Sequence, residues 1–108
     1  AGGSLYVAKR GGKLAFQTAA SGASTTSRWT IETDGHFLPA ANNTYDIGSS
    51  SYRVRNVYTH DLNLSNEGSK NDVDGTWGNY TIQEGESDLF LINKRNGKKY
   101  KFNLTEVS

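Results

Sequence analysis

Paired acidic side chains in the last quarter of the sequence are the first residues that could do chemistry. Glu84, Glu86 and Asp88 stand close together around Gly85, and paired carboxylates serve glycosidases as general acid and base. Acidic residues that flank a turn are more often simply solvated. A polysaccharide-degrading enzyme is therefore the weaker interpretation of this group.

The other reactive side chains form no catalytic or metal-binding pattern. The chain has no cysteine and two histidines, His36 and His60, and neither histidine lies in an HExxH or HxH spacing. Asp72 and Asp74 stand in a DVDG run, which lacks the third carboxylate and the distal Glu of a calcium loop. We therefore expect no catalytic residue, no metal site and no cofactor, in a protein that binds rather than an enzyme.

Aromatic residues beside amides and carboxylates are the stronger functional signal. Proteins hold sugars by stacking a ring on their C–H faces and by hydrogen-bonding their hydroxyls through Asn and Asp. Residues 65–79 form the longest polar stretch, and they contain one tryptophan. The alternative is that this tryptophan fills the core or an oligomer seam, since Trp is buried on average. The candidate carbohydrate-binding residues are Trp77, Tyr80, Asn79, Asp72 and Asp74.

Short strands and turns must position these residues. Gly, Ser, Thr and Asn make up 43 of 108 residues, and short β-branched and aromatic runs recur between them, which is typical of an all-β chain. Residues 5–8 and 14–16 flank Gly11–Gly12 and predict a hairpin, and residues 29–33 predict a strand that ends at an Asp-Gly turn. Pro39 should end regular structure after residues 37–38.

The C-terminal third predicts three further strands. Residues 80–83 and 89–92 are apolar runs, and residues 99–104 alternate apolar and polar side chains, as in a half-buried strand. Asn96–Gly97 predicts a two-residue hairpin turn between the last two strands. Residues 52–64 favour a strand because Val, Tyr and Thr dominate, with a helix over residues 51–61 as the alternative.

The composition limits the kinds of partner that the chain is expected to bind. The formal net charge is +1, with 12 basic and 11 acidic residues, so nothing favours binding to nucleic acid or insertion into a membrane. Leu, Ile, Val and Phe number 21 of 108 residues, which is low for a globular domain. A thin core of this kind favours oligomerisation, with a marginally stable monomer as the alternative.

Two short motifs occur twice. The run KRGGK at residues 9–13 matches KRNGK at residues 94–98, and WTIE at residues 29–32 matches YTIQ at residues 80–83. The pattern predicts that this sequence is a segment of a longer chain of repeated units, in which each unit packs on its neighbours. Chance similarity between β-hairpins is the alternative.

The most distinctive runs are YDIGSSSYR at residues 45–53 and GKKYKF at residues 97–102. Over residues 29–107 the chain resembles the C-terminal ends of phage tail-fibre and virion-appendage proteins, including the L-shaped tail fibres of some siphophages. These runs are structural motifs rather than active sites. Taken together with the repeat, the resemblance predicts that residues 1–27 are the end of a preceding fibre unit, a hairpin plus linker, and that residues 28–108 are the C-terminal fibre tip domain.

The resemblance implies an intertwined, parallel homotrimer in the tail fibre of the virion. Its tip would adhere to host surface polysaccharide, such as the O-antigen of lipopolysaccharide. Many such fibres carry a C-terminal intramolecular chaperone that trimerises the chain and then cuts itself off, commonly after a serine. Ser108 is the expected processing site on this view. The alternative function is a purely structural module that trimerises or caps a virion fibre.

Overall fold

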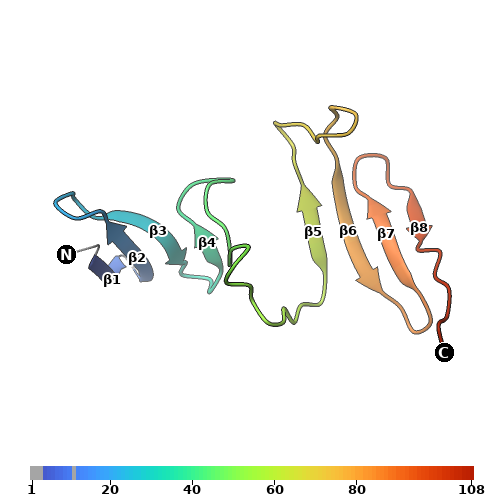
Figure 1. Ribbon diagram of the computed structural model, residues 1–108, viewed down its shortest axis with the longest axis horizontal. Helices are drawn as coiled ribbons and strands as arrows, with labels where there is room; N and C mark the ends of the chain where they lie inside the picture. Colours follow the sequence, from blue (N-terminus) through green and yellow to red (C-terminus); the bar gives the residue numbers. More distant parts are fainter. Residues whose placement is uncertain (1–3, 11) are drawn as a thin grey trace. The chain divides into compact units, whose positions relative to one another are not determined.

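The computed structural model describes the backbone of residues 4–10 and 12–108 and the side chains of residues 12–108. Every regular element in this part of the chain is a β-strand, which confirms the all-β prediction (Figure 1). The strands are β1 (Ser4–Arg10), β2 (Lys13–Ala19), β3 (Thr26–Ile31), β4 (Phe37–Pro39), β5 (Leu62–Ser65), β6 (Asn79–Glu84), β7 (Leu89–Asn93) and β8 (Lys99–Lys101).

The first sheet is an antiparallel meander in the order β1-β2-β3-β4. β1 pairs with β2 as the predicted hairpin requires, with Val7 opposite Phe16, and Gly11 of the predicted Gly11–Gly12 turn lies outside the described residues. The Asp34–Gly35 turn joins β3 to β4: Gly35 has φ of 91° and its N–H donates to the Glu32 carbonyl at 2.9 Å. A glycine suits this position because other residues rarely adopt positive φ. As expected, β4 ends at Pro39.

Aromatic side chains gather on one face of the first sheet. Strand pairing places Phe16 opposite Trp29 and Ile31 opposite Phe37. Trp29 stacks on Phe37 with ring centroids 5.0 Å apart, and Phe16 meets Phe37 edge-on at 6.2 Å. Phe37 nevertheless stays 53% exposed, so this cluster forms an open apolar face rather than a closed core.

Residues 40–61 contain no strand or helix. The predicted strand over residues 52–64 is therefore wrong except at β5, and the alternative helix is absent too. The apolar alternation breaks between Val54 and Val57, so no single apolar face forms that could pack on a sheet. One local turn is well defined, because the Ser49 N–H donates to the Tyr52 carbonyl at 2.9 Å.

The second sheet is another antiparallel meander, in the order β5-β6-β7-β8. Its register aligns one apolar residue from each strand into a row across the sheet: Leu62, Ile82, Leu91 and Tyr100. Residues directly opposite on paired strands share a face. The row therefore lies on one side of the sheet, and the outer two members, Leu62 and Tyr100, are 46% and 48% exposed.

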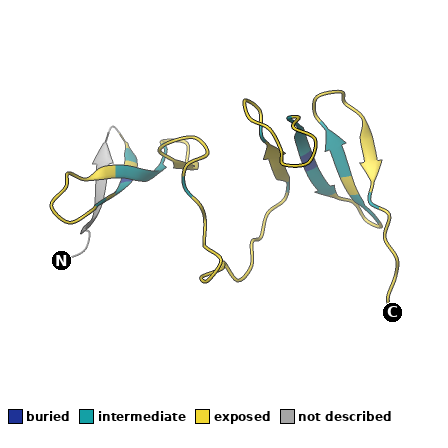
Figure 2. Cartoon of the chain, turned by 45° about the horizontal axis from the view of Figure 1, so that its top comes forward, coloured by how far each residue is buried: buried dark blue, intermediate teal, exposed yellow. Residues whose placement is uncertain are grey.

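The chain buries very little of its side-chain surface. Among residues 12–108, Ala15 and Thr81 alone are buried, at 3% and 1% exposure. In Figure 2 the central strands are coloured as intermediate, while the connecting segment and the C-terminal residues are exposed. The strand predicted for residues 99–104 is confirmed over Lys99–Lys101, but it is shorter than expected, and β8 is exposed throughout rather than half-buried.

The turn between β7 and β8 is longer than the predicted two-residue hairpin. It spans residues 94–98, with the Gly97 N–H donating to the Asn93 carbonyl at 2.8 Å. Gly97 does adopt a positive φ, 76°.

The contacts within the chain divide it into two units, residues 1–55 and residues 56–108. Each unit holds one sheet. The expected fibre-unit boundary between residues 27 and 28 falls within β3 (Thr26–Ile31). That boundary refers to repeats along a longer chain and stays a prediction. Within the described residues, no helix has the length and apolar character needed to cross a membrane.

Candidate functional site

The loop between β5 and β6, residues 66–78, is held together by its own side chains. Asn71 Oδ1 accepts hydrogen bonds from the N–H groups of Val73 at 2.7 Å and Asp74 at 2.9 Å. Asp74 Oδ1 accepts three more, from Asn71 Nδ2 and from the N–H and hydroxyl of Thr76, at 2.7, 3.1 and 2.7 Å. Asn and Asp favour such turns because their short side chains reach nearby backbone groups.

These hydrogen bonds also fix the charge of Asp74. Asn71 first, and then Thr76, hold the pKa of the Asp74 carboxyl below its usual value of 3.8. Donors aimed at a carboxylate stabilise its ionised form. The loop therefore carries an ionised carboxylate at neutral pH.

Asn66 closes the base of the same loop. Its Oδ1 accepts from the Gly78 N–H at 2.7 Å, and its own N–H donates to the Gly78 carbonyl at 3.3 Å. A Cβ on Gly78 would lie 2.9 Å from Tyr80 Cε2. The glycine is thus required for the Tyr80 ring to lie this close to the backbone.

The loop and the neighbouring strand form a cleft of about 620 Å³. Three of the predicted sugar-binding residues, Trp77, Tyr80 and Asp74, line it together. The other two, Asn79 and Asp72, are not among the lining residues. Asn79 begins β6 opposite Ser65, and Asp72 is exposed on the loop. The cleft is further lined by Asn63, Leu64, Ser65, Asn66, Asn71, Thr76 and Gly78.

Trp77 is half-buried and does not belong to a core. The Arg95 guanidinium lies over its ring, 3.8 Å from the centroid, and Arg95 Nη1 donates to the Trp77 carbonyl at 2.9 Å. One ring face is therefore already stacked against a cation. The chemistry of the cleft is that of a ring and a carboxylate beside several amides, which suits a polyhydroxylated ligand.

The amide and hydroxyl residues of the cleft were missed by the sequence analysis. Asn66, Asn71 and Thr76 lie within the polar stretch that was singled out, and Asn63 lies on the adjoining strand. The Asn-x-x-Asp spacing of residues 71–74 is a signal for an Asx turn that could have placed Asn71 in the site.

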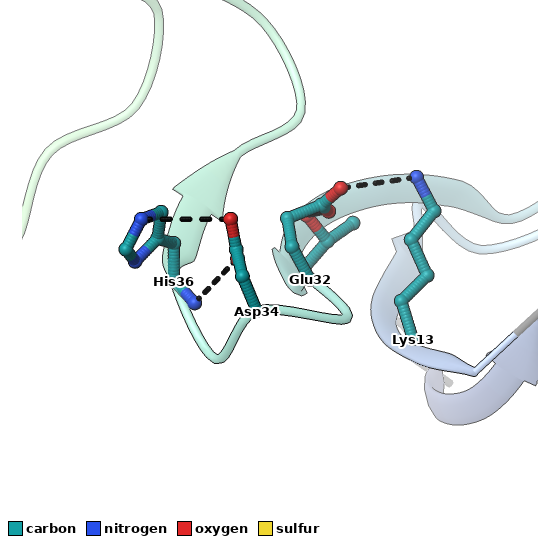
Figure 3. A network of polar contacts seen from close by, with 5 residues as sticks. Lys13, Glu32, Asp34 and His36 are labelled. Carbon is teal, nitrogen blue, oxygen red and sulfur yellow. Dashed lines mark hydrogen bonds and ion pairs between the residues drawn. The ribbon is translucent and has the colours of Figure 1, made fainter.

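His36 is exposed and directly follows the Asp34–Gly35 turn. Figure 3 shows its two contacts with Asp34: His36 Nε2 lies 3.5 Å from Asp34 Oδ2, and the His36 N–H donates to Oδ1 at 3.1 Å. The two side chains are 71% and 61% exposed. The neighbouring Lys13–Glu32 pair, 3.4 Å apart, is a separate contact. A hydrogen bond from Thr30, and then Lys13, lowers the pKa of Glu32.

The remaining candidates lie elsewhere. Glu84 ends β6, and Asp88 directly precedes β7, so the two carboxylates stand at opposite ends of one turn. The Gly85 N–H donates to the Asp88 carbonyl at 2.8 Å within this turn. Ser108 is exposed, and its role as a processing site stays a prediction, as does the expectation that the protein is not an enzyme.

Comparison of the chain with family models, with curated proteins and with solved structures gives no match in any of the three. The fold and the cleft are therefore interpreted from their own geometry.

Proposed function

We propose that this chain is the homotrimeric tip domain of a phage tail fibre and that it adheres to polysaccharide on the host surface. The proposal has two parts. Obligate association of identical chains rests on the exposed apolar surface, and adhesion rests on the cleft beside Trp77 and Tyr80.

The amount of exposed surface carries the first part. The chain exposes 9291 Å², whereas a compact monomer of 11.8 kDa would expose about 5,900 Å². Even two separate compact bodies of half this mass would expose only about 7,100 Å². The excess of roughly 2,000 Å² per chain is of the size that obligate interfaces bury.

The kind of surface that is exposed supports the same conclusion. In residues 40–61, Ile47, Tyr52, Val57 and Tyr58 are 70%, 84%, 74% and 92% exposed. A stretch without strands that presents large apolar side chains gains stability only when another surface covers them. Copies of the same chain, each with its own open apolar sheet face, supply such surfaces.

The cleft supports adhesion. Its loop is fixed by internal hydrogen bonds before any ligand arrives, so binding requires little ordering of the protein. Trp77 and Tyr80 offer ring surface, and the ionised Asp74 accepts hydrogen bonds from hydroxyls.

Binding of the purified domain to bacterial surface polysaccharides tests this part. We expect Trp77→Ala to weaken binding by about tenfold or more, since buried tryptophans commonly dominate interface energies, while the oligomer stays intact. Val73→Ala is the matched control, because Val73 is 95% exposed on the same loop and does not line the cleft. Undiminished binding by Trp77→Ala would contradict adhesion through this cleft.

A purely structural module that trimerises or caps a fibre is the second candidate. The contact between Arg95 and Trp77 favours it, because a guanidinium 3.8 Å from the ring centroid already occupies one face. On this alternative the domain forms the same oligomer, and no surface polysaccharide binds it.

A further inference from the structure

A histidine and two carboxylates meet where the chain reaches the second sheet. His60 and Asp61 directly precede β5, and Glu84 is the last residue of β6. Because Leu62 pairs with Ile82, the antiparallel register continued outward places His60 across from Glu84. One ligand atom from each of the three residues lies within 4.8 Å of the other two.

The Asp61 carboxylate gives an independent reason to expect a ligand at this point. Its Oδ1 is the one buried side-chain nitrogen or oxygen among residues 12–108 that has no hydrogen-bond partner. Its Oδ2 accepts a hydrogen bond from Gln83 Nε2 at 3.2 Å, which fixes the orientation of the carboxylate. The Asp61 side chain is 32% exposed as a whole, but Oδ1 itself is enclosed, so a cation beside it would compensate the missing hydrogen bond.

This unpaired Asp61 oxygen lies next to the His60 ring. His60 Nδ1 lies 3.3 Å from Asp61 Oδ1, which is the separation expected for two atoms that share one metal ion at about 2 Å. The His60 side chain is 93% exposed, and Glu84 is exposed as well. Both can therefore adjust to an ion without disturbing the sheet.

We propose that His60, Asp61 and Glu84 bind a divalent transition-metal ion such as zinc. One imidazole and two carboxylates suit zinc and its neighbours better than calcium or magnesium, which prefer oxygen ligands alone. Two carboxylates with a neutral imidazole balance the ion's charge. Three protein ligands leave a position for water, and Gln83 acts as a positioning residue for Asp61.

A bound ion would cross-link the segment that precedes β5 to the end of β6. The adhesion cleft is lined by none of these three residues, and the site lies within one chain. The metal proposal therefore stands or fails separately from the proposed function.

Calorimetric titration of the tag-free protein with zinc chloride tests the proposal. We expect one zinc per chain, an affinity loss of roughly 100-fold or more for His60→Ala and Glu84→Gln, and about tenfold for Gln83→Ala. His36→Ala is the matched control because His36 also pairs with an aspartate but has no third ligand. Glu86→Gln is the control for Glu84, since it removes an acid from the same turn.

Thermal unfolding provides a second measurement. Zinc should raise the unfolding temperature of the unsubstituted protein and of both controls, because a ligand that binds only the folded state stabilises it. It should not raise that of the isosteric Glu84→Gln variant. Absence of zinc binding would overturn the proposal, as would binding that survives Glu84→Gln or that is lost in His36→Ala.

Discussion

Asp74 is the residue on which the cleft depends most. One of its carboxylate oxygens accepts from three donors on Asn71 and Thr76, and the same bonds keep the carboxyl ionised. Removing the negative charge would therefore loosen the loop that positions Trp77 and Tyr80.

The lowered pKa of Asp74 predicts how the loop responds to acid. Because the folded-state pKa lies below the usual 3.8, ionised Asp74 stabilises the loop fully above that value. The contribution is lost as pH falls through the lowered folded-state pKa. The chemical shift of the Thr76 amide should follow this transition, with a midpoint below 3.8.

Asp72→Asn should leave the Asp74 transition unchanged, whereas Asp74→Asn should abolish it. Asp72 is exposed on the same loop and serves as the matched control. A midpoint at or above 3.8 would contradict the hydrogen-bonding account of this loop.

At the residue scale, the sequence identified the ring and carboxylate of the cleft but not its full lining. Trp77, Tyr80 and Asp74 stood out because aromatic and acidic side chains in a polar stretch are rare enough to notice. Asn63 and Asn66 did not, because a chain with 10 asparagines gives no reason to choose among them. Their positions follow from the pairing of β5 with β6, which joins residues far apart in sequence.

At the scale of elements, glycine decides the conformation of the connecting segment. Gly48 has φ of 85°, and a Cβ there would lie 3.1 Å from the Tyr52 carbonyl oxygen. The turn from Ser49 to Tyr52 therefore requires both the left-handed backbone and the missing side chain.

Gly48→Ala should destabilise the first unit through both effects. The left-handed backbone alone costs about 1–2 kcal/mol for an alanine, and the close contact adds to it. Gly22→Ala measures the cost of the left-handed backbone alone, because Gly22 has φ of 81° and a Cβ placed there would have nothing within 4 Å. Denaturant unfolding should show the larger loss for Gly48→Ala, and equal losses would rule out the proposed close contact.

Elements with turn signals at both ends were predictable, and those without them were not. The Asp34–Gly35 turn located β3 and β4, because such residues act locally. Residues 52–61 were predicted as strand from their Val, Tyr and Thr content, yet β-propensity describes fit to a half-buried surface. Residues 52–60 are all exposed and belong to no strand, so they lack a half-buried surface of this kind.

The apolar row across the second sheet predicts which substitution breaks the assembly. Leu62→Asp places a charge on the face shared with Ile82, Leu91 and Tyr100, where a covering copy would have to bury it. We expect the oligomer to dissociate, as measured by sedimentation.

Asn63→Asp is the control for that substitution. It adds the same charge one residue along the strand, on the opposite face, and keeps the oxygen that accepts from the Thr81 hydroxyl at 2.6 Å. Its oligomer should persist. Equal dissociation of both variants would contradict burial of the apolar row in particular.

At the scale of the whole molecule, the low apolar content of the sequence and the open sheets of the structure agree. A chain with 34% hydrophobic residues forms two four-stranded sheets, and only two side chains among residues 12–108 are buried. Sequence composition could indicate the shortage of core. It could not indicate which faces stay open, because that depends on strand register.

The central claim is that three copies complete one another's cores, and the mass in solution tests it most directly. Light scattering on the purified domain should give the mass of three 11.8 kDa chains, unchanged on dilution. A stable, folded monomer would contradict the account, because the exposed apolar side chains of each sheet would then need no second copy of the chain to cover them.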